Sequence, residues 1–369
     1  MPSADPARRC PRCGSEVAAG DQFCEACGAE IVGAAPPVPA GPPAGQEAPI
    51  ELSRPVRPTQ DRTPAGAVGP ARPCVSCGGV VAADGYCETC GAKEVSERDH
   101  FVESPAPWVA GICDRGISHH RNEDAMALAA DPAPGTRAVL VVCDGVSTST
   151  DSDVASLAGA KAAREVLVAN RPAGLGTHDS RVAALQRSLG AAATAANQAV
   201  VDTSVPAAEL ADDSSASATL VAAVLDGSLL VAGCIGDSRA YWLPDRGHAL
   251  ILTTDDSVAQ VRIAAGVPRE EAENGPQAHA ITRWLGRDAP DVVPTCTATD
   301  LDASGWVLVC SDGLWNYASE AAQLQALLSA LVPDVAAAAP LDLADALVRW
   351  ACEQGGKDNI TVTLARFAP

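Results

Sequence analysis

Four C-x2-C pairs near the start of the chain constrain its fold more than any other feature. They hold eight of the fourteen cysteines, namely Cys10, Cys13, Cys24, Cys27, Cys74, Cys77, Cys87 and Cys90. A glycine follows every pair, so the backbone can curl round and turn both thiolates toward one point. Four thiolates bind Zn²⁺ as a tetrahedron and leave no coordination position for a substrate. The spacing therefore predicts two structural zinc sites, each built from two successive pairs.

These two groups of cysteines resemble zinc ribbons, which are modules too small to fold readily without their metal. Eight unrelated buried or redox-active cysteines would not explain the repeated spacing. The segment between the groups is dense in Pro, Ala and Gly and predicts an extended linker, because it has too little branched apolar content to pack. We expect a first ribbon over residues 1–32, a linker over 33–72, a second ribbon over 73–94 and a short linker over 95–106.

Composition limits what the remainder of the chain can be. Hydrophobic residues make up 47% and aromatic residues only 3%, so the core must consist mainly of Ala, Val, Leu and Ile. The net charge is −20, which argues against a nucleic-acid or membrane partner. Neither a long apolar run nor a signal-peptide pattern stands out, so we expect a cytoplasmic protein. The other cysteines are expected as reduced core residues: Cys113, Cys143, Cys234, Cys296, Cys310 and Cys352.

From Trp108 onward, short apolar strands alternate with alanine-rich helical stretches. Strands are predicted at 138–143, 217–225, 229–235, 306–310 and 359–367, and helices at 153–170, 179–202, 319–331 and 341–353. The pair Asp226-Gly227 predicts a hairpin turn between two of these strands. Hairpin strands with helices gathered elsewhere favour antiparallel sheets covered by helices over a parallel βαβ ladder. We therefore expect an α+β fold over residues 107–369.

Acidic residues stand where several of these strands end. The set comprises Glu123, Asp124, Asp144, Asp237, Asp312 and Asp358. A single Asp-Gly pair is usually only a turn, so the argument depends on the whole ordered set. Rigid strand ends hold carboxylates still, and carboxylates that converge repel one another unless cations lie among them. Ligands that offer only oxygen select hard ions such as Mg²⁺ and Mn²⁺.

The segments that carry these carboxylates resemble, in their order along the chain, the PPM (type-2C-like) metal-dependent Ser/Thr protein phosphatases. They are DRG (114–116), NEDA (122–125), VCDG (142–145), GDSRAY (236–241), TRWLG (282–286), CSDGL (310–314) and KDNIT (357–361). The resemblance covers residues 108–367. It implies a four-layer α-β-β-α sandwich of two antiparallel β-sheets flanked by helices, with the metal centre at one edge.

The resemblance also implies a role for each carboxylate. Asp144 would bridge two Mn²⁺ or Mg²⁺ ions, and Asp312 and Asp358 would complete the shell of one ion. Glu123 and the backbone carbonyl of Gly145 would serve the other ion, largely through waters. Within the catalytic set we count Asp144, Asp312, Asp358 and His119.

Three further features follow from the same resemblance. Asp124 would lie behind the ligands, and Asp237 matches an aspartate that in bacterial members helps to hold a third, weaker ion. Residues 254–266 correspond to the family's mobile flap. The implied activity is hydrolysis of phosphoserine and phosphothreonine in proteins by a water activated between two ions, without a phosphoenzyme. The implied partners are phosphoproteins and a Ser/Thr protein kinase system, with the ribbons recruiting partners or regulating the site.

The chain departs from the family pattern at two positions. His119 stands four residues before Glu123, where active members commonly place an arginine that binds the substrate phosphate. His119 could take over that role, with Arg115 or Arg121 as substitutes, or it could simply be an exposed loop histidine. Val146 follows Gly145, where some members carry a histidine as proposed general acid.

These departures keep a second hypothesis open, in which a catalytically weak or inactive phosphatase-like domain acts as a phosphoprotein-binding scaffold. The complete carboxylate set favours the enzyme. A third hypothesis, a nucleic-acid adaptor, ranks last, because the first 100 residues carry 9 basic and 13 acidic side chains and lack a basic face with stacking aromatics.

Overall fold

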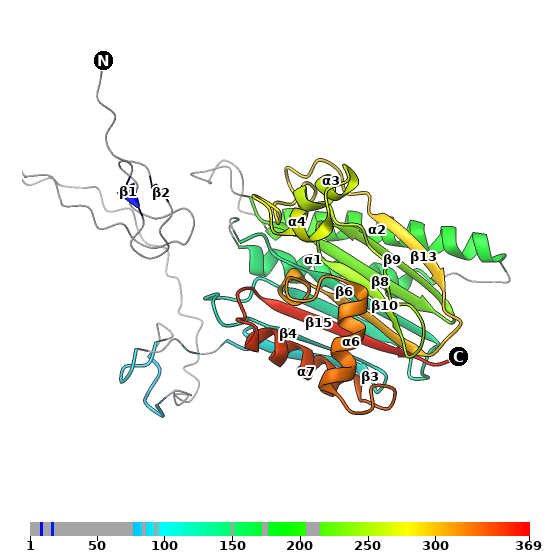
Figure 1. Cartoon of the computed structure of the whole chain (residues 1–369), viewed down its shortest axis with the longest axis horizontal. Coiled ribbons are helices and arrows are strands. Elements are labelled where there is room, and N and C mark those ends of the chain that lie inside the picture. Colours follow the sequence, from blue (N-terminus) through cyan, green and yellow to red (C-terminus); the bar gives the residue numbers. More distant parts are fainter. Residues whose placement is uncertain are drawn as a thin grey trace, which may run out of the picture. The chain divides into compact units, whose positions relative to one another are not determined.

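The computed structural model of the chain divides into two compact units, Met1–Gly69 and Pro70–Pro369 (Figure 1). It describes residues 8–9, 16–17, 77–82, 86–91, 94, 96–147, 149, 151–171, 176–203 and 215–369. In the first unit, β1 (Arg8–Arg9) and β2 (Glu16–Val17) pair antiparallel. The four cysteines predicted for the first ribbon, and Cys74 of the second, lie outside the described residues.

Two antiparallel β-sheets form the core of the second unit. One has the order β11-β10-β14-β15-β4-β3 and the other the order β13-β9-β8-β6-β5. The strands of the first are β3 (His100–Ala106), β4 (Val109–Asp114), β10 (Arg239–Pro244), β11 (Leu250–Ile251), β14 (Gly305–Cys310) and β15 (Ile360–Phe367). Those of the second are β5 (Ala125–Ala130), β6 (Arg137–Cys143), β8 (Leu220–Asp226), β9 (Leu229–Ile235) and β13 (Thr295–Asp300). A short pair, β7 (Ser217–Ala218) with β12 (Leu285–Gly286), lies beside them.

Small and branched apolar side chains from both sheets form one buried cluster between them. Val142 and Val221 come from one sheet, and Val307 and Val309 from the other. Strands buried on both faces explain the uninterrupted apolar runs in the sequence, because neither face of the strand meets water. The sheets therefore form the sandwich that the sequence predicts.

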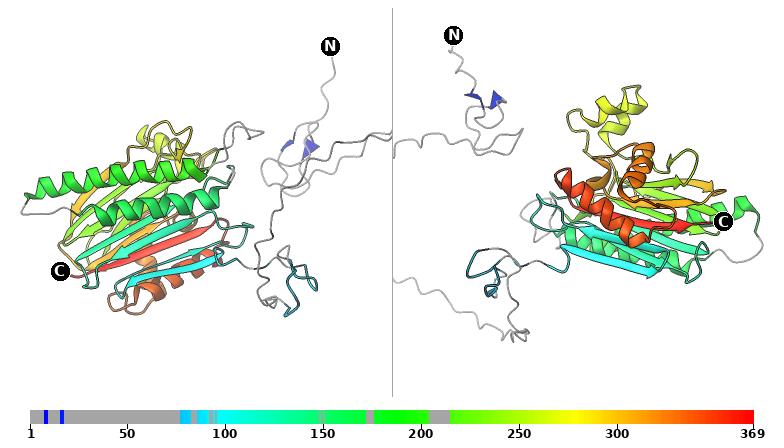
Figure 2. Two further views of the ribbon diagram at one scale, coloured as in Figure 1. Left: turned by 180° about the vertical axis from the view of Figure 1, so that it is seen from behind. Right: turned by 60° about the horizontal axis from the view of Figure 1, so that its bottom comes forward.

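Helices cover both outer faces of the sandwich (Figure 2). The helices α1 (Ser152–Ala169) and α2 (His178–Thr203) pack on the β6/β8 sheet through buried alanines and leucines. The helices α6 (Ala321–Leu331) and α7 (Pro340–Glu353) cover the β14/β15 sheet. This order of layers confirms the predicted four-layer α-β-β-α sandwich, and each predicted helix lies within two residues of its observed bounds.

The structure differs from the sequence analysis in the stretch 95–106, which was expected to be a linker. It contains β3, which pairs antiparallel with β4 at the edge of its sheet. Alternate residues of β3 are exposed, and its sequence HFVESPA holds no apolar run. An edge strand of this kind leaves almost no hydrophobic pattern to detect.

The segment expected to be the flap forms a small helical insertion beside the sandwich. It consists of α3 (Val258–Ala264) and α4 (Arg269–Glu273), which share a minor core around Ala259, Ala272 and Ala278. A buried ion cluster joins this insertion to β10 of the sandwich. Within it, Arg239 Nη2 lies 2.6 Å from Asp255 Oδ2 and 2.9 Å from Glu273 Oε1.

The cysteines outside the ribbons are free thiols, as the sequence analysis expects. Cys113, Cys143, Cys234 and Cys310 are buried, whereas Cys296 and Cys352 are only half-buried. Within the described ranges, no helix combines the length and the apolar content that crossing a membrane would need.

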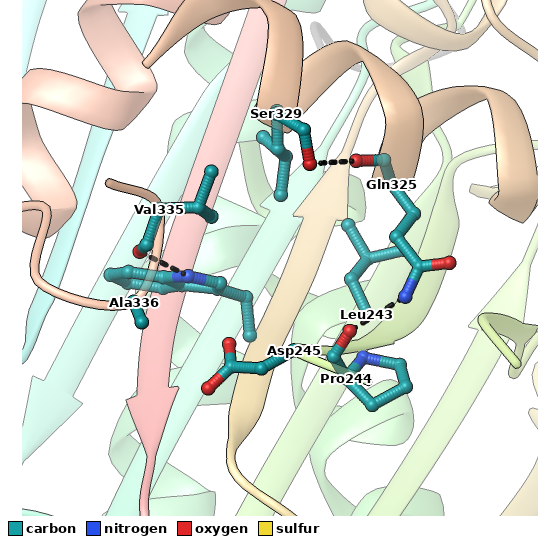
Figure 3. A pocket seen from close by; sticks show the side chains of 9 residues that line it. Leu243, Pro244, Asp245, Gln325, Ser329, Val335 and Ala336 are labelled. Atoms are coloured by element: carbon teal, nitrogen blue, oxygen red, sulfur yellow. Dashed lines mark hydrogen bonds between the residues drawn. The ribbon is translucent and has the colours of Figure 1, made fainter. Parts of the chain in front are cut away.

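A small cavity of about 120 Å³ lies between β10 and α6 (Figure 3). Its lining includes Pro244, Trp306, Gln325 and Val335, and Trp306 Nε1 donates to the Val335 carbonyl at 3.1 Å. Pro244 and Trp306 lie at the ends of their strands opposite to Arg239 and Cys310. The cavity is below the size range of ligand pockets, about 300–1,000 Å³. Because the cavity lies at the opposite ends of these strands, it is separate from the strand ends that carry the acidic residues.

Replacing Arg239 with methionine should lower the free energy of unfolding by about 3–5 kcal/mol, because it leaves Asp255 and Glu273 buried without their cation. Urea unfolding followed by tryptophan fluorescence measures this. All six tryptophans lie at or after position 108 and report on the sandwich. The matched control is Arg349→Met, since Arg349 is 71% exposed and its ion pair among the described residues is with Asp345 on the same helix. Equal effects of the two substitutions would contradict a buried cluster.

Candidate metal centre

Four aspartates from separate strand ends converge at one edge of the sandwich. Asp144 directly follows β6, and Asp237 lies between β9 and β10. Asp312 begins the short helix α5 (Asp312–Trp315) after β14, and Asp358 precedes β15. Burial, followed by the negative charges of Asp124, Asp312, Asp358 and Asp237, raises the pKa of Asp144 well above its usual value. These aspartates thus form one cluster, in which the charges of the others raise the pKa of Asp144.

The backbone around Asp144 is fixed on both sides. The amide of Asp144 donates to Thr219 Oγ1 at 3.1 Å, and the amide of Thr219 donates back to the Asp144 carbonyl at 2.7 Å. The next residue, Gly145, donates to the Glu123 carbonyl at 3.1 Å. A Cβ atom at Gly145 would lie 2.7 Å from that carbonyl oxygen and 2.8 Å from the Ser152 carbonyl oxygen. Only glycine therefore allows the Asp144 loop to lie against the loop of Glu123.

Asp124 is fully buried at the centre of the cluster. Its Oδ2 accepts hydrogen bonds from Ser311 Oγ at 2.6 Å and Thr361 Oγ1 at 2.7 Å. Burial raises its pKa to about 6 despite these two hydrogen bonds. Its Oδ1, like Oδ1 of Asp312, is buried and has no hydrogen-bond partner among the described residues.

Buried carboxylate oxygens without donors are costly unless a cation lies beside them. The repulsion that raises the pKa of Asp144, Asp237 and Asp312 would be relieved by the same cation. Because all the convergent groups offer oxygen, the site fits hard divalent ions such as Mn²⁺ and Mg²⁺.

Glu123 is held in one orientation by three polar groups. Its Oε1 accepts from Arg121 Nη2 at 2.6 Å and from Ser152 Oγ at 2.5 Å. Burial alone would raise the pKa of Glu123, but hydrogen bonds from Ser147, Ser152 and Arg121 outweigh it and lower the pKa. Glu123 is therefore ionised at neutral pH, and its carboxylate lies against Arg121 and the first residue of α1.

The sequence analysis assigned no role to Asn359, although it lies inside the KDNIT segment. Asn359 is buried, and its Oδ1 accepts from the Glu123 amide at 2.8 Å. Its Nδ2 donates to the carbonyls of Arg115 and Arg121 at 2.8 and 3.1 Å. Asn359 therefore ties the whole loop before Glu123 to the first residues of β15. The signal for Asn359 in the sequence was an amide side chain directly before an apolar strand.

The structure brings His119 into the cluster. Its Nε2 lies 3.3 Å from Asp358 Oδ1, and its Nδ1 lies 3.9 Å from Glu123 Oε2. The two arginines considered as substitutes are already engaged, because Arg121 binds Glu123 and Arg115 Nη1 donates to the His119 carbonyl at 3.0 Å. His119 is thus the predicted candidate for phosphate binding that lies near both Asp358 and Glu123.

Three of the four predicted ligands of the second ribbon lie together. The sulfur atoms of Cys77, Cys87 and Cys90 lie within 4.8 Å of one another. Backbone hydrogen bonds, of which that from Cys90 is the largest contribution, lower the pKa of Cys87 to about 6. A convergent set of three thiols fits Zn²⁺.

Comparison with known proteins assigns the chain to a family. The family model described as Protein phosphatase 2C matches residues 115–350, which is more than half of the chain. The chain therefore belongs to the protein phosphatase 2C family. A second model, described as Double zinc ribbon, matches residues 10–91. Both resemblances drawn from the sequence are thereby confirmed.

Named relatives match about two thirds of the chain. The chain is 33% identical over 258 residues to the serine/threonine protein phosphatase PstP of Mycobacterium tuberculosis, covering 69% of this chain but only 44% of that protein. It is 29% identical over 253 residues to the serine/threonine phosphatase stp of Listeria monocytogenes, covering 68% of this chain and 92% of that protein. A solved catalytic domain of PstP with two manganese ions has a TM-score of 0.52 and 28% identity, covering 72% of this chain and 99% of that one.

Without divalent metal, the sandwich should become less stable as pH rises from about 5 to 8. An unfolded Asp has a pKa near 3.9, whereas folding raises the pKa of Asp124 to about 6 and that of Asp237 to about 7. The folded state therefore holds more protons, and its advantage is lost as pH rises through these values. Glu123, whose pKa is lowered by folding, affects the stability of the sandwich only at lower pH.

The measurement is the melting temperature from tryptophan fluorescence across this pH range, in EDTA and in excess Mn²⁺. Mn²⁺ should raise the melting temperature most at pH 8, where the carboxylates are ionised. A melting temperature in EDTA that is flat or rises with pH would show that these carboxylates are not buried together.

Proposed function

We propose that the sandwich is a Mn²⁺- or Mg²⁺-dependent phosphatase that hydrolyses phosphoserine and phosphothreonine in proteins. The observation that carries this proposal is the cluster of mutually repelling carboxylates at the strand ends, in which Oδ1 of Asp312 is buried without a hydrogen-bond partner among the described residues. Membership of the protein phosphatase 2C family supports it, as do the names of the relatives and the two manganese ions in the PstP structure.

In this proposal, Asp144, Asp312 and Asp358 would hold the metal ions together with Glu123 and the backbone carbonyl of Gly145. When bound, ions of this kind acidify a water and neutralise charge on the phosphoryl group. The support for this assignment is electrostatic, since the charges of Asp312 and Asp358 are among the causes that raise the pKa of Asp144.

Two further aspartates have different roles. Asp124 is enclosed by Ser311 and Thr361 and stabilises the cluster from behind. Asp237 would hold a third, weaker ion; its pKa is raised to about 7 by burial and by the charge of Asp255. Its backbone carbonyl accepts from Trp315 Nε1 at 2.9 Å, which fixes the loop between β9 and β10.

The residues of this chain also define how the substrate is held. His119 lies beside Asp358 at the rim and donates a ring N–H to the substrate phosphate. Arg121 is bound to Glu123 and stays with that carboxylate. Val146 offers no proton, so the leaving alkoxide takes its proton from water. Its backbone amide donates to the Ser217 carbonyl at 2.9 Å, which holds the residue after Gly145 in place.

We further propose that each ribbon holds one structural zinc ion and serves to recruit protein partners or to regulate the sandwich. The support is the matched Double zinc ribbon model and the thiol cluster of Cys77, Cys87 and Cys90. Partner phosphoproteins, an opposing Ser/Thr kinase, a role in signal transduction and a cytoplasmic location complete the proposal. The division into ribbons, linkers and sandwich is part of it, with the start of the sandwich moved from residue 107 to about residue 100, where β3 begins to pair with β4.

A second candidate function is a phosphoprotein-binding scaffold with little or no activity. It is favoured by His119 in place of the family's arginine and by Val146 in place of a general acid. The two functions differ in one measurable quantity, which is phosphate release that depends on added metal.

Asp144→Asn should lower kcat/KM for a phosphothreonine peptide by about 100-fold or more in saturating Mn²⁺, because a neutral amide cannot bridge two cations. Phosphate release by the full chain measures it. The matched control is Asp302→Asn, at an exposed position in the β13–β14 turn, which should behave like wild type. Wild-type protein that binds Mn²⁺ but releases no phosphate would favour the scaffold instead. Full activity in Asp144→Asn would refute the assigned centre.

His119→Ala should raise KM for the same peptide more than it lowers kcat, since the side chain lies at the rim beside Asp358. His119→Arg should restore or lower KM, because a guanidinium binds a phosphate through two hydrogen bonds. Steady-state kinetics with His120→Ala as control measure both parameters. An unchanged KM in His119→Ala would assign the histidine to the loop rather than to the substrate.

A further inference from the structure

A single arginine from the segment before β3 holds the loop that carries Glu123. Arg98 Nη2 donates to the backbone carbonyl of Asp124 at 2.9 Å and to that of Asp153 at 3.0 Å, with a longer contact of 3.4 Å to that of Asn122. Asn122 Nδ2 in turn donates to the Arg98 carbonyl at 2.9 Å. The two segments are therefore bonded in both directions.

The three carbonyls bound by Arg98 surround the elements that orient Glu123. Asn122 and Asp124 flank it in sequence, and Asp153 follows Ser152, whose hydroxyl binds the Glu123 carboxylate. One guanidinium thus fixes both the backbone of Glu123 and the start of α1 that holds its side chain. Hydrogen bonds from a charged donor are stronger than neutral ones, so this link is a firm one.

Arg98 is itself well anchored. Its amide donates to Ser96 Oγ at 3.1 Å within a turn closed by the Asp99 amide and the Ser96 carbonyl at 2.9 Å. The Asp99 carbonyl accepts from the Arg115 amide at 2.8 Å, just beyond the end of β4. The guanidinium carbon lies 5.4 Å from the centre of the Phe101 ring. The arginine is therefore placed by its own segment before it reaches the loop.

We propose that Arg98 is a positioning residue for the metal centre, acting through the Asn122–Asp124 backbone and the start of α1 to set the orientation of Glu123 and with it the affinity for Mn²⁺. This inference rests on the proposed function. Arg98 lies outside the family match, which begins at residue 115. Only seven residues separate it from Cys90 of the second ribbon. The segment that leads out of the ribbon is therefore the one that holds the loop, which offers a route by which a ribbon-bound partner alters the site.

The test compares Arg98→Met, Arg98→Lys and the exposed-site control Arg349→Met in the full chain. Calorimetry measures the dissociation constant of Mn²⁺, and hydrogen exchange of the metal-free protein measures protection around the Glu123 amide, which is bonded to Asn359. Arg98→Met should weaken Mn²⁺ binding by about tenfold or more, as loss of a group that orients a ligand does. Exchange should accelerate around Glu123 but not in β8. Arg98→Lys should retain part of the affinity, and Arg349→Met all of it.

Two results would overturn the inference while wild type still binds Mn²⁺. One is an Arg98→Met protein with wild-type Mn²⁺ affinity; the other is exchange that accelerates equally in β8, which identifies a general stabilising role. Wild-type protein that fails to bind Mn²⁺ would overturn the proposed function, and this inference with it. The wild-type titration therefore distinguishes the two failures.

Discussion

Repulsion among carboxylates at one edge of the sandwich is the constraint on which the rest of this structure depends. Asp124, Asp144, Asp237 and Asp312 each have a pKa above the usual value, with burial as the first cause and neighbouring acids among the others. Such a cluster tends to spread apart or take up protons unless its backbone is fixed and cations are bound. The fold fixes the backbone, and the carboxylate oxygens offer a place for cations to bind.

The fixing groups are hydrogen-bonding side chains that come from distant parts of the chain. Thr219 holds the Asp144 backbone, Ser311 and Thr361 hold the Asp124 carboxylate, and Asn359 holds the loop before Glu123. They can do so because antiparallel strands bring residues that are far apart in the sequence to the same edge, as with Thr361 and Asp124. The sandwich acts as a rigid frame whose strand ends position acids such as Asp144.

Most of the frame and of the acid set was predictable from the sequence, and most of the fixing groups were not. Strands such as β6 and β14 are buried on both faces, so continuous apolar runs ending in Asp144 and Asp312 mark them. The sequence analysis missed β3 because an edge strand with exposed alternate residues carries no such apolar run. Ser311 and Arg98 were missed because their roles exist only through contacts with residues distant in the sequence, Asp124 among them, which no local pattern encodes. The ribbons illustrate the opposite case, since their cysteine spacing is entirely local.

The same reasoning explains why regulation is easiest to build at the Glu123 side of the centre. Asp144 directly follows β6 and Asp312 comes two residues after the end of β14, and both strands are buried on both faces, so moving these acids would disturb the core. Glu123 instead lies in a loop whose geometry depends on Arg98, Asn359 and the start of α1. A few hydrogen bonds therefore set its position, and a change in one of them costs far less than repacking a core strand. Glu123, which we propose as a metal ligand and which is held by the segment nearest to the second ribbon, is thus also the acid that can be displaced with least energy.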